Sequence, residues 1–211
     1  MKTEILKADH PVAFHHAVDV LKNGGLVVFP TDTVYGLAAW PYQVEFVERL
    51  YVVKGRNSTR AIAVLIPGSE VLDRVAISPS ESAMRLAKHF WPGPLTIIMN
   101  KHTSLPDTLS PQGTLGIRVP DHSVALAILH MIGPLAVTSA NLSGRDNTTT
   151  AQEVLAQLGG RVHLIIDGGK SPGGLPSTVV DCTTAEPQIL RSGPISEADI
   201  RAELSKSDEE T

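Results

Sequence analysis

The sequence contains only one cysteine, Cys182, among its 211 residues. A single thiol excludes an internal disulfide and any zinc site built from several cysteines. No apolar run is long enough to span a bilayer, and the N-terminal stretch MKTEILKADH lacks the apolar core of a secretion signal. Aromatic residues make up only 4% of the chain, so the core must consist mainly of aliphatic side chains. These absences favour a soluble cytoplasmic protein.

The distribution of charge and histidine argues against two further classes of protein. The formal net charge is −4, so no overall positive field predicts binding to nucleic acid. The eight histidines are scattered, and none is paired with an acid at the spacing of a metal site on a helix. We therefore expect no metal site made of side chains.

Motifs for covalent catalysis and for a phosphate-binding loop are also missing. No Gly-x-Ser-x-Gly elbow occurs, and Cys182 lies in a strand pattern without a neighbouring base, which favours a core role. The segment DGGKSPGG (167–174) contains Gly-Lys-Ser, but Leu164 stands where a Walker loop needs its first glycine. Any chemistry must therefore come from residues distributed along the chain.

Strand and helix patterns alternate with short connections, which predicts one mixed α/β domain with about eight strands. Helix signals include a capping box at 78–81, another at Thr150 and Glu153, a cap at Ser196, and an apolar run at 122–132 that predicts a buried helix. The remaining predicted helices cover 11–23 and 42–53. The predicted strands cover 26–29, 61–66, 95–99, 115–119, 134–138, 163–167, 177–181 and 187–191.

Several of these strands end in hydroxyl residues or in a cation among turn formers. Hydroxyls and backbone N–H groups at strand ends are suited to hold oxyanions, and lysine and arginine add fixed positive charge. Arg118 and Arg191 are the most informative, because each ends an apolar strand. The segments are PTDTVYGL (30–37), KGRNSTR (54–60), GTLGIRVP (113–120), VTSANLSG (137–144), GGLPSTVVD (173–181) and ILRSG (189–193).

Simpler interpretations of each segment stay open at this point. Loops are generally rich in Gly, Ser, Thr and Pro. The cluster 54–60 is compatible with an ordinary solvated helix end. Arg118 is compatible with an ion pair to Asp121, and Arg191 with a charge that protects a strand edge. From spacing alone, the sequence predicts an anion-binding site of unknown purpose.

Taken together, these segments and FWPGPLT (90–96) resemble the YrdC-like family of threonylcarbamoyl-adenylate synthases. The resemblance runs in order from about residue 10 to about residue 200, and PTDTVYGL with SANLSG (139–144) is its most specific part. It implies an α+β (mixed α/β) fold of the YrdC/RibB-like type, in which a twisted mixed sheet flanked by helices carries a central cationic cleft. The implied organisation is one domain over 1–205 and a flexible polar tail over 206–211.

The resemblance also implies a reaction. L-threonine, bicarbonate or CO2, and ATP as a substrate would give threonylcarbamoyl-AMP and pyrophosphate, with Mg²⁺ carried by the phosphates. The product would pass to a threonylcarbamoyl-transferase machinery that modifies adenosine in tRNA. Weak binding of tRNA, as double-stranded RNA, belongs to the same expectation, and binding to a membrane does not.

Site residues follow from the resemblance position by position. Thr31 and Ser177 match positions that hold threonine, and Arg118 matches the clamp on its carboxylate. Lys54 and Arg56 match the catalytic phosphate-binding positions. The matches to ATP-binding positions also include Arg60, Thr114, Ser139, Asn141, Asn147 and Arg191. Asn57 and Arg60-Ala61 depart from the proline-containing pattern that often follows the KGR cluster, and Leu65 stands where some members have a histidine.

Two other functions remain as alternatives. A non-catalytic RNA-binding module of the same fold would show tight, salt-sensitive RNA binding and no ATP turnover. A carbamoyl-transfer role resembling that of hydrogenase-maturation proteins is disfavoured, because those proteins carry zinc-binding cysteine pairs and this chain has only Cys182.

Overall fold

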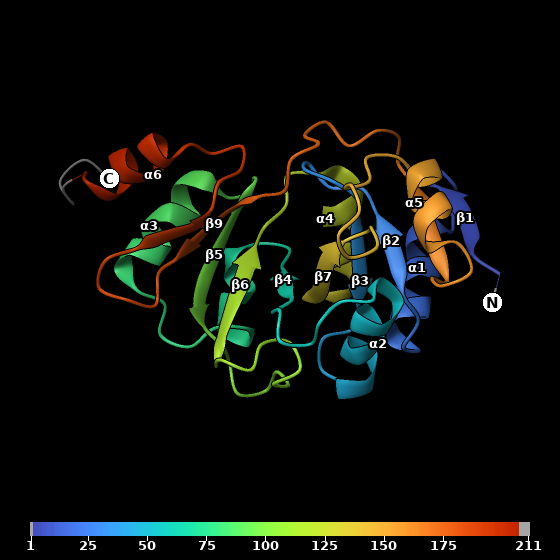
Figure 1. Ribbon diagram of the computed structural model, residues 1–211, viewed down its shortest axis with the longest axis horizontal. Helices are drawn as coiled ribbons and strands as arrows, with labels where there is room; N and C mark the ends of the chain where they lie inside the picture. Colours follow the sequence, from blue (N-terminus) through green and yellow to red (C-terminus); the bar gives the residue numbers. More distant parts are fainter. Residues whose placement is uncertain (1, 207–211) are drawn as a thin grey trace.

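The computed structural model describes residues 2–206, which form one ten-stranded mixed sheet with helices on both faces (Figure 1). Apart from Lys206, the tail predicted at 206–211 lies outside these residues. No helix in this range combines the length and the hydrophobicity needed to cross a membrane.

The sheet places strands from the two halves of the chain side by side, in the order β1-β8-β2-β3-β7-β4-β6-β5-β9-β10. The sheet combines parallel pairs (β1 with β8, β2 with β8, β4 with β6, β5 with β9) with antiparallel ones, so it is mixed as predicted. The bounds are β1 Glu4–Lys7, β2 Val27–Phe29, β3 Gly36–Ala39, β4 Ala63–Leu65, β5 Leu95–Asn100, β6 Thr114–Arg118, β7 Leu135–Ser139, β8 Leu164–Asp167, β9 Thr178–Asp181 and β10 Gln188–Arg191.

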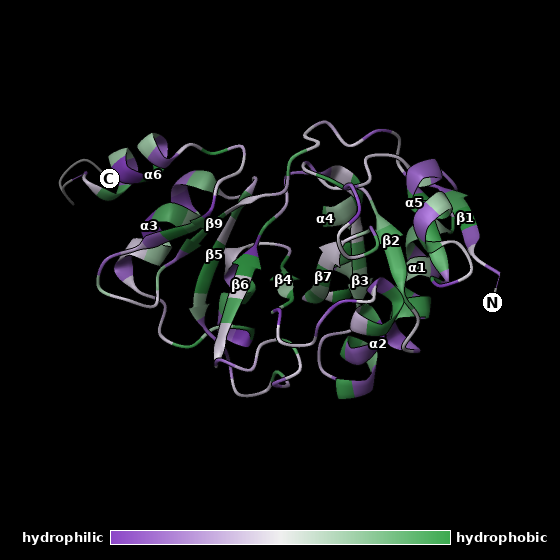
Figure 2. Ribbon diagram, in the orientation of Figure 1, coloured by the Kyte–Doolittle hydropathy of each residue, from purple (hydrophilic) through white to green (hydrophobic). Residues whose placement is uncertain are grey.

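Helices cover the two faces of the sheet unequally. On one face, α1 and α4 pack on β8, β2, β3 and β7, but do not extend over β6, β5 and β9. On the other face, α2, α5 and α3 bury the aliphatic side chains of both halves, and α6 packs on α3. Figure 2 shows hydrophobic strands between helices of mixed character. The bounds are α1 Ala13–Lys22, α2 Val44–Lys54, α3 Glu81–Phe90, α4 Ser123–Ile132, α5 Ala151–Leu158 and α6 Glu197–Leu204, with a 3₁₀ helix at Ser69–Arg74.

Three details differ from the sequence-based expectation. The sheet has ten strands and not about eight. The two strands that were not predicted are β1, which is a mostly exposed edge strand, and β3, which is built from the residues that close PTDTVYGL. The cap of α3 is Ser80, which accepts a hydrogen bond from the Ala83 N–H, so the box predicted to start at Ser78 was wrong by two residues. The helix α4 is buried along one side, through Val124, Ala125, Ile128 and Leu129, but His130 and Met131 are exposed.

Candidate active site

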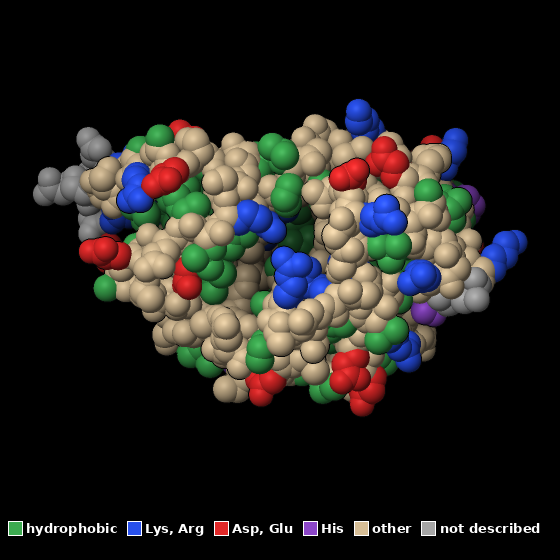
Figure 3. All heavy atoms as spheres, in the orientation of Figure 1, with side chains coloured by type: hydrophobic (Ala, Val, Ile, Leu, Met, Phe, Trp, Pro, Cys, Tyr) green, Lys and Arg blue, Asp and Glu red, His purple; other side chains and the backbone are tan. Residues whose placement is uncertain are grey.

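A cavity of about 310 Å³ lies on the face of the sheet that α1 and α4 leave uncovered. Residues two apart along extended backbone share a face, and five such pairs, four within strands and one at the start of β9, line this cavity. Figure 3 shows the corresponding hollow near the middle of the molecule, with Lys and Arg side chains at its rim. The five pairs are Ala63 and Leu65, Thr96 and Ile98, Gly116 and Arg118, Val137 and Ser139, and Ser177 and Val179.

The loop after β2 forms one wall of the cavity and is held together by its own hydroxyl groups. The Thr31 hydroxyl donates to the Val34 carbonyl at 2.7 Å and accepts from the N–H groups of Thr33 (3.2 Å) and Val34 (3.3 Å). Both threonines are buried, and their Oγ1 atoms lie 3.0 Å apart. The hydroxyl-rich sequence after the strand therefore builds a tight loop in which one side-chain hydroxyl binds three backbone polar groups.

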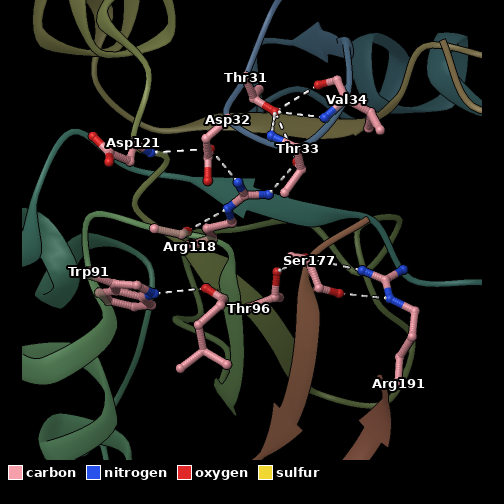
Figure 4. A network of polar contacts seen from close by, with 12 residues as sticks. Thr31, Asp32, Thr33, Val34, Trp91, Thr96, Arg118, Asp121, Ser177 and Arg191 are labelled. Atoms are coloured by element: carbon pink, nitrogen blue, oxygen red, sulfur yellow. Dashed lines mark hydrogen bonds and ion pairs between the residues drawn. The ribbon is translucent and has the colours of Figure 1, made fainter. Parts of the chain in front are cut away.

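Arg118 ends β6 and lines the cavity, and its guanidinium is held by three contacts (Figure 4). Nε donates to the Gly93 carbonyl at 2.9 Å, and Nη1 donates to Thr33 Oγ1 at 3.0 Å. Nη2 forms an ion pair with Asp32. The alternative pairing with Asp121 is wrong for the side chain, since Asp121 contributes only its backbone N–H, to Asp32 Oδ1 at 3.2 Å. Arginine has five N–H groups, so these contacts leave two for a ligand.

A second polar chain runs along the other wall, from β5 to β10. Thr96 Oγ1 and Ser177 Oγ lie 2.7 Å apart, and both residues are buried. Arg191 donates to Ser177 twice, from Nε to the carbonyl at 3.0 Å and from Nη2 to Oγ at 3.1 Å. Arg191 thus lines the cavity, and its hydrogen bonds go to Ser177. Its placement is not that of a charge that only protects the edge of β10.

Lys54 lies behind the cavity wall, at the C-terminal end of α2. Its ammonium donates to the Ser139 carbonyl, to the Asn141 carbonyl at 2.6 Å and to Asn141 Oδ1 at 3.1 Å. An ammonium has three donors, so these acceptors use all of them. Burial and the nearby charge of Arg56 lower the pKa of Lys54 to about 7. Lys54 and Asn141 therefore support the wall around Ser139 rather than line the cavity in this structure.

The other predicted site residues divide between the cavity and its surroundings. Arg56 lines it, with Nη2 donating to the Ala61 carbonyl at 2.8 Å, and the exposed Asn147 also contributes to the lining. Arg60 is exposed outside the lining, although its charge lowers the pKa of Arg56. Thr114 begins β6 and lies outside the lining as well.

Three arginines converge on this cavity, as the sequence suggested. Burial lowers the pKa of Arg118, Arg56 and Arg191, and the charge of Arg191 further lowers the pKa of the other two. Mutual repulsion of this kind requires the groups to be close. An anion that enters the cavity would relieve both the repulsion and the cost of burial.

Sequence reasoning missed three polar residues of the site, Asp32, Thr33 and Thr96. Asp32 and Thr33 lie inside the motif PTDTVYGL, and Thr96 ends FWPGPLT, so a signal was present but gave no role for each side chain. Tyr35 lies in the motif PTDTVYGL too, and the sequence alone favours neither core packing nor substrate contact for it. It is fully buried, and its hydroxyl donates to the Gly169 carbonyl at 2.6 Å, which ties the loop after β8 to the site.

Comparison with known proteins adds an independent observation. A family model named for Sua5, YciO and YrdC, and described as "Telomere recombination", matches residues 19–193. A Mycobacterium tuberculosis protein named "Putative threonylcarbamoyl-AMP synthase" is 39% identical over 181 residues, which cover 85% of this chain and 83% of that protein. A Bacillus subtilis threonylcarbamoyl-AMP synthase is 41% identical over 192 residues, which cover 88% of this chain and 55% of that protein.

A solved structure has the same fold as this chain and belongs to a protein of similar sequence. The crystal structure of Pyrococcus abyssi Sua5 complexed with L-threonine superposes with a TM-score of 0.89 and 36% identity, over 91% of this chain and 57% of that one. This chain thus spans little more than half the length of the Bacillus and Pyrococcus proteins. The fold and the family expected from the motifs are confirmed, and the chain belongs to the Sua5/YciO/YrdC family.

Proposed function

We propose that this protein is an L-threonylcarbamoyladenylate synthase, which makes threonylcarbamoyl-AMP and pyrophosphate from L-threonine, bicarbonate or CO2, and ATP. The names of relatives that are 39% and 41% identical confirm the predicted enzyme class, a nucleotidyltransferase. The observation that carries the proposal is the convergence of Arg56, Arg118 and Arg191 on one cavity beside buried hydroxyl groups.

In this proposal the amino acid lies at the end of the cavity formed by Arg118, Thr31 and Ser177. The two N–H groups that Arg118 has left would bind the threonine carboxylate, because a guanidinium fork matches a carboxylate. The hydroxyl of Thr31 is used within its own loop, so its part is to shape the pocket wall. Ser177, whose hydroxyl contacts that of Thr96, is a better candidate than Thr31 for a direct polar contact with the bound threonine.

ATP would occupy the part of the cavity toward Arg56, Arg191, Ser139 and Asn147. Arg56 and Arg191 offer positive charge for the phosphates at the rim. Lys54 would act from behind the wall, by holding the end of β7 at Ser139 and by adding its charge to the field on the phosphates. The predicted contacts of Arg60, Thr114 and Asn141 with ATP would need these residues to approach the ligand from outside the present lining.

The chemistry needs no protein nucleophile. The neutral amine of threonine takes up CO2 and loses a proton, which forms a carbamate. A carbamate oxygen then attacks the α-phosphorus of ATP, and the bond to pyrophosphate breaks. Such a transfer depends mainly on positioning and on stabilisation of negative charge. A rigid cavity with fixed guanidinium groups supplies both.

Magnesium would enter on the phosphates of ATP. No cluster of three or more His, Cys, Asp or Glu side chains suited to a metal ion occurs among residues 2–206, and no carboxylate lines the cavity. A lining of this kind fits a Mg²⁺ ion whose ligands are phosphate oxygens and water. The ion would neutralise phosphate charge, while the arginines orient the nucleotide.

A pyrophosphate-release assay tests the proposal. The purified protein is incubated with ATP, Mg²⁺ and bicarbonate, and with each of the twenty amino acids in turn. We expect release that depends on L-threonine and bicarbonate and is unchanged in Arg201→Ala, a substitution on α6 at an exposed ion pair with Glu197. Absence of threonine-dependent release, together with salt-sensitive RNA binding, would favour the RNA-binding module instead.

The downstream steps belong to the same proposal. The mixed anhydride that the reaction forms is reactive toward nucleophiles, so a transferase that modifies tRNA adenosine is the expected acceptor of the product. Transient tRNA binding near the cavity and a cytoplasmic location would fit this use.

A further inference from the structure

The three arginines that line the cavity differ in their partners. Arg118 forms an ion pair with Asp32. Arg56 donates to the carbonyls of Arg60 and Ala61, and Arg191 donates to the carbonyl and hydroxyl of Ser177. Within residues 2–206, therefore, only one of these three guanidinium groups has a carboxylate beside it.

Asp32 is held in place behind Arg118. Its Oδ1 accepts from Arg118 Nη2 and from the Asp121 N–H at 3.2 Å. Its Oδ2 is buried and has no hydrogen-bond partner among the described residues. Asp32 is not part of the cavity lining, whereas its neighbours Thr31 and Thr33 are. The carboxylate thus acts on the cavity through Arg118 and not by direct contact with a ligand.

This arrangement changes which anions Arg118 attracts. A carboxylate beside a guanidinium cancels much of its field at a distance, while the N–H groups still offer directed hydrogen bonds at close range. A monoanion such as an amino-acid carboxylate needs mainly those hydrogen bonds. A polyanion such as a triphosphate gains mainly from net charge, and Arg56 and Arg191 offer more of it.

We propose that Asp32 is a specificity-determining positioning residue, which pairs with Arg118 and so reserves it for the carboxylate of the amino acid against the phosphates of ATP. The inference rests on the proposed function. It assigns a reason for the charge balance in the cavity: two ligands that both carry oxygen anions must bind side by side, each at its own arginines. Without Asp32, all three arginines would compete for the triphosphate.

The wild-type protein gives the first test, because threonine and inorganic tripolyphosphate do not react with each other. Tripolyphosphate is titrated by calorimetry at fixed salt, with and without saturating L-threonine. We expect the Kd for tripolyphosphate to change by less than about twofold, since the two anions use different arginines. A rise of about tenfold or more would overturn the proposal, because it would show that tripolyphosphate occupies Arg118 as well.

The variant Asp32→Asn gives the second test. The amide keeps the shape and the acceptor for Arg118 but removes the negative charge. We expect threonine to raise the Kd for tripolyphosphate by about fivefold or more in this variant, with competition in both directions. Unchanged, independent binding in a folded Asp32→Asn protein would contradict the inference. If this variant does not fold, the wild-type titration decides.

Asp121→Asn is the matched control. It removes the same charge from a neighbouring exposed residue whose carboxylate points away from Arg118 (Figure 4). We expect it to behave as the wild type, and competition equal to that of Asp32→Asn would overturn the specific role of Asp32. Pyrophosphate release separates the two proposals: threonine-dependent release with competition in the wild type refutes this inference alone, and no such release refutes the proposed function.

Discussion

Arg118 and Thr33, which are 85 positions apart in the sequence, are joined by a hydrogen bond of 3.0 Å from Nη1 to Oγ1. The bond connects the end of β6 to the loop after β2, and so links the two halves of the sheet across the cavity. Together with Asp32 and the Gly93 carbonyl, it fixes the plane of the guanidinium before any ligand enters. Such preorganisation lowers the entropic cost of binding.

Arg118→Lys should separate threonine binding from ATP binding. Lysine keeps the charge but loses the planar fork, so we expect the KM for threonine to rise by about tenfold to 100-fold and the KM for ATP by less than about threefold. Steady-state pyrophosphate release at varied threonine and varied ATP measures both values. Arg56→Ala is the reciprocal variant and should affect mainly ATP. Equal losses for both ligands in Arg118→Lys would refute the carboxylate clamp.

Much of this site was predictable because its chemistry is carried by short motifs. Arg118, Arg191, Ser177 and Arg56 all reach the cavity that their strand ends and loops implied. Lys54 does not reach it, because its three N–H groups are taken by Ser139 and Asn141, 85 and 87 residues further along the chain. No local pattern encodes such contacts between distant residues.

The fold was predictable to a similar extent and for a similar reason. The alternation of apolar runs gave eight strands, but β3 escaped because its residues, Gly36–Ala39, are too small to give an apolar strand signal. Its strand conformation depends on β2 and β7 on either side, which pair with it in antiparallel register. Gly36 is required there, because a Cβ would lie 2.8 Å from Val137 Cγ1.

The pKa of Lys54, lowered to about 7, predicts a pH dependence. In the proposed function the charged form of Lys54 adds to the positive field on the phosphates, so we expect kcat/KM for ATP to fall as pH rises through about 7. Bound phosphates favour the charged ammonium, so the fall in kcat should occur at higher pH. In Lys54→Arg, the descending limb near pH 7 should disappear, because a guanidinium stays protonated. Profiles of pyrophosphate release at saturating threonine test this, and an unshifted limb in Lys54→Arg would assign it to another group.

The lowered pKa of Lys54 should also make the free energy of unfolding depend on pH, in a direction that follows from the pKa. Between pH 7 and about 10.4 the unfolded chain holds the Lys54 proton more tightly than the folded protein does. The unfolded state then binds more protons, so this residue makes the free energy of unfolding rise with pH across that window. Denaturant titrations at several pH values, for the wild type and Lys54→Met, isolate the contribution. A wild-type slope equal to that of Lys54→Met would contradict it.

Thr96→Val tests the contribution of the Thr96 hydroxyl, which the sequence did not predict, to the position of Ser177. Valine keeps the volume but removes the oxygen that lies 2.7 Å from Ser177 Oγ. We expect a loss of stability of about 1 kcal/mol and a threonine KM about five to ten times higher, because Ser177 loses one of its two fixed partners. Thr184→Val, an exposed threonine in the β9–β10 connection, is the control. An unchanged KM would show that Ser177 is fixed by Arg191 alone.

Gly193→Ala should disturb the site through the backbone. A Cβ at this position would lie 2.4 Å from Thr178 N and 2.6 Å from Pro176 O, so the segment around Ser177 must shift. We expect a loss of stability of about 1–3 kcal/mol and a clear fall in turnover. Thermal unfolding and pyrophosphate release check both, with the exposed neighbour Ser192→Ala as the control. Full activity in Gly193→Ala would mean that Ser177 need not be held so exactly in place.

The order of strands in the sheet has a consequence for synthesis of the chain. The cavity takes its residues from Thr31 to Arg191, and β9, near the end of the sequence, pairs with β5, which lies 83 residues earlier in register (Leu95 beside Thr178). A nascent polypeptide that has emerged from the ribosome only through Pro176 lacks Ser177 and Arg191. The cavity therefore becomes complete only late in synthesis, and a product that ended at Pro176 would lack two of the polar side chains that line it.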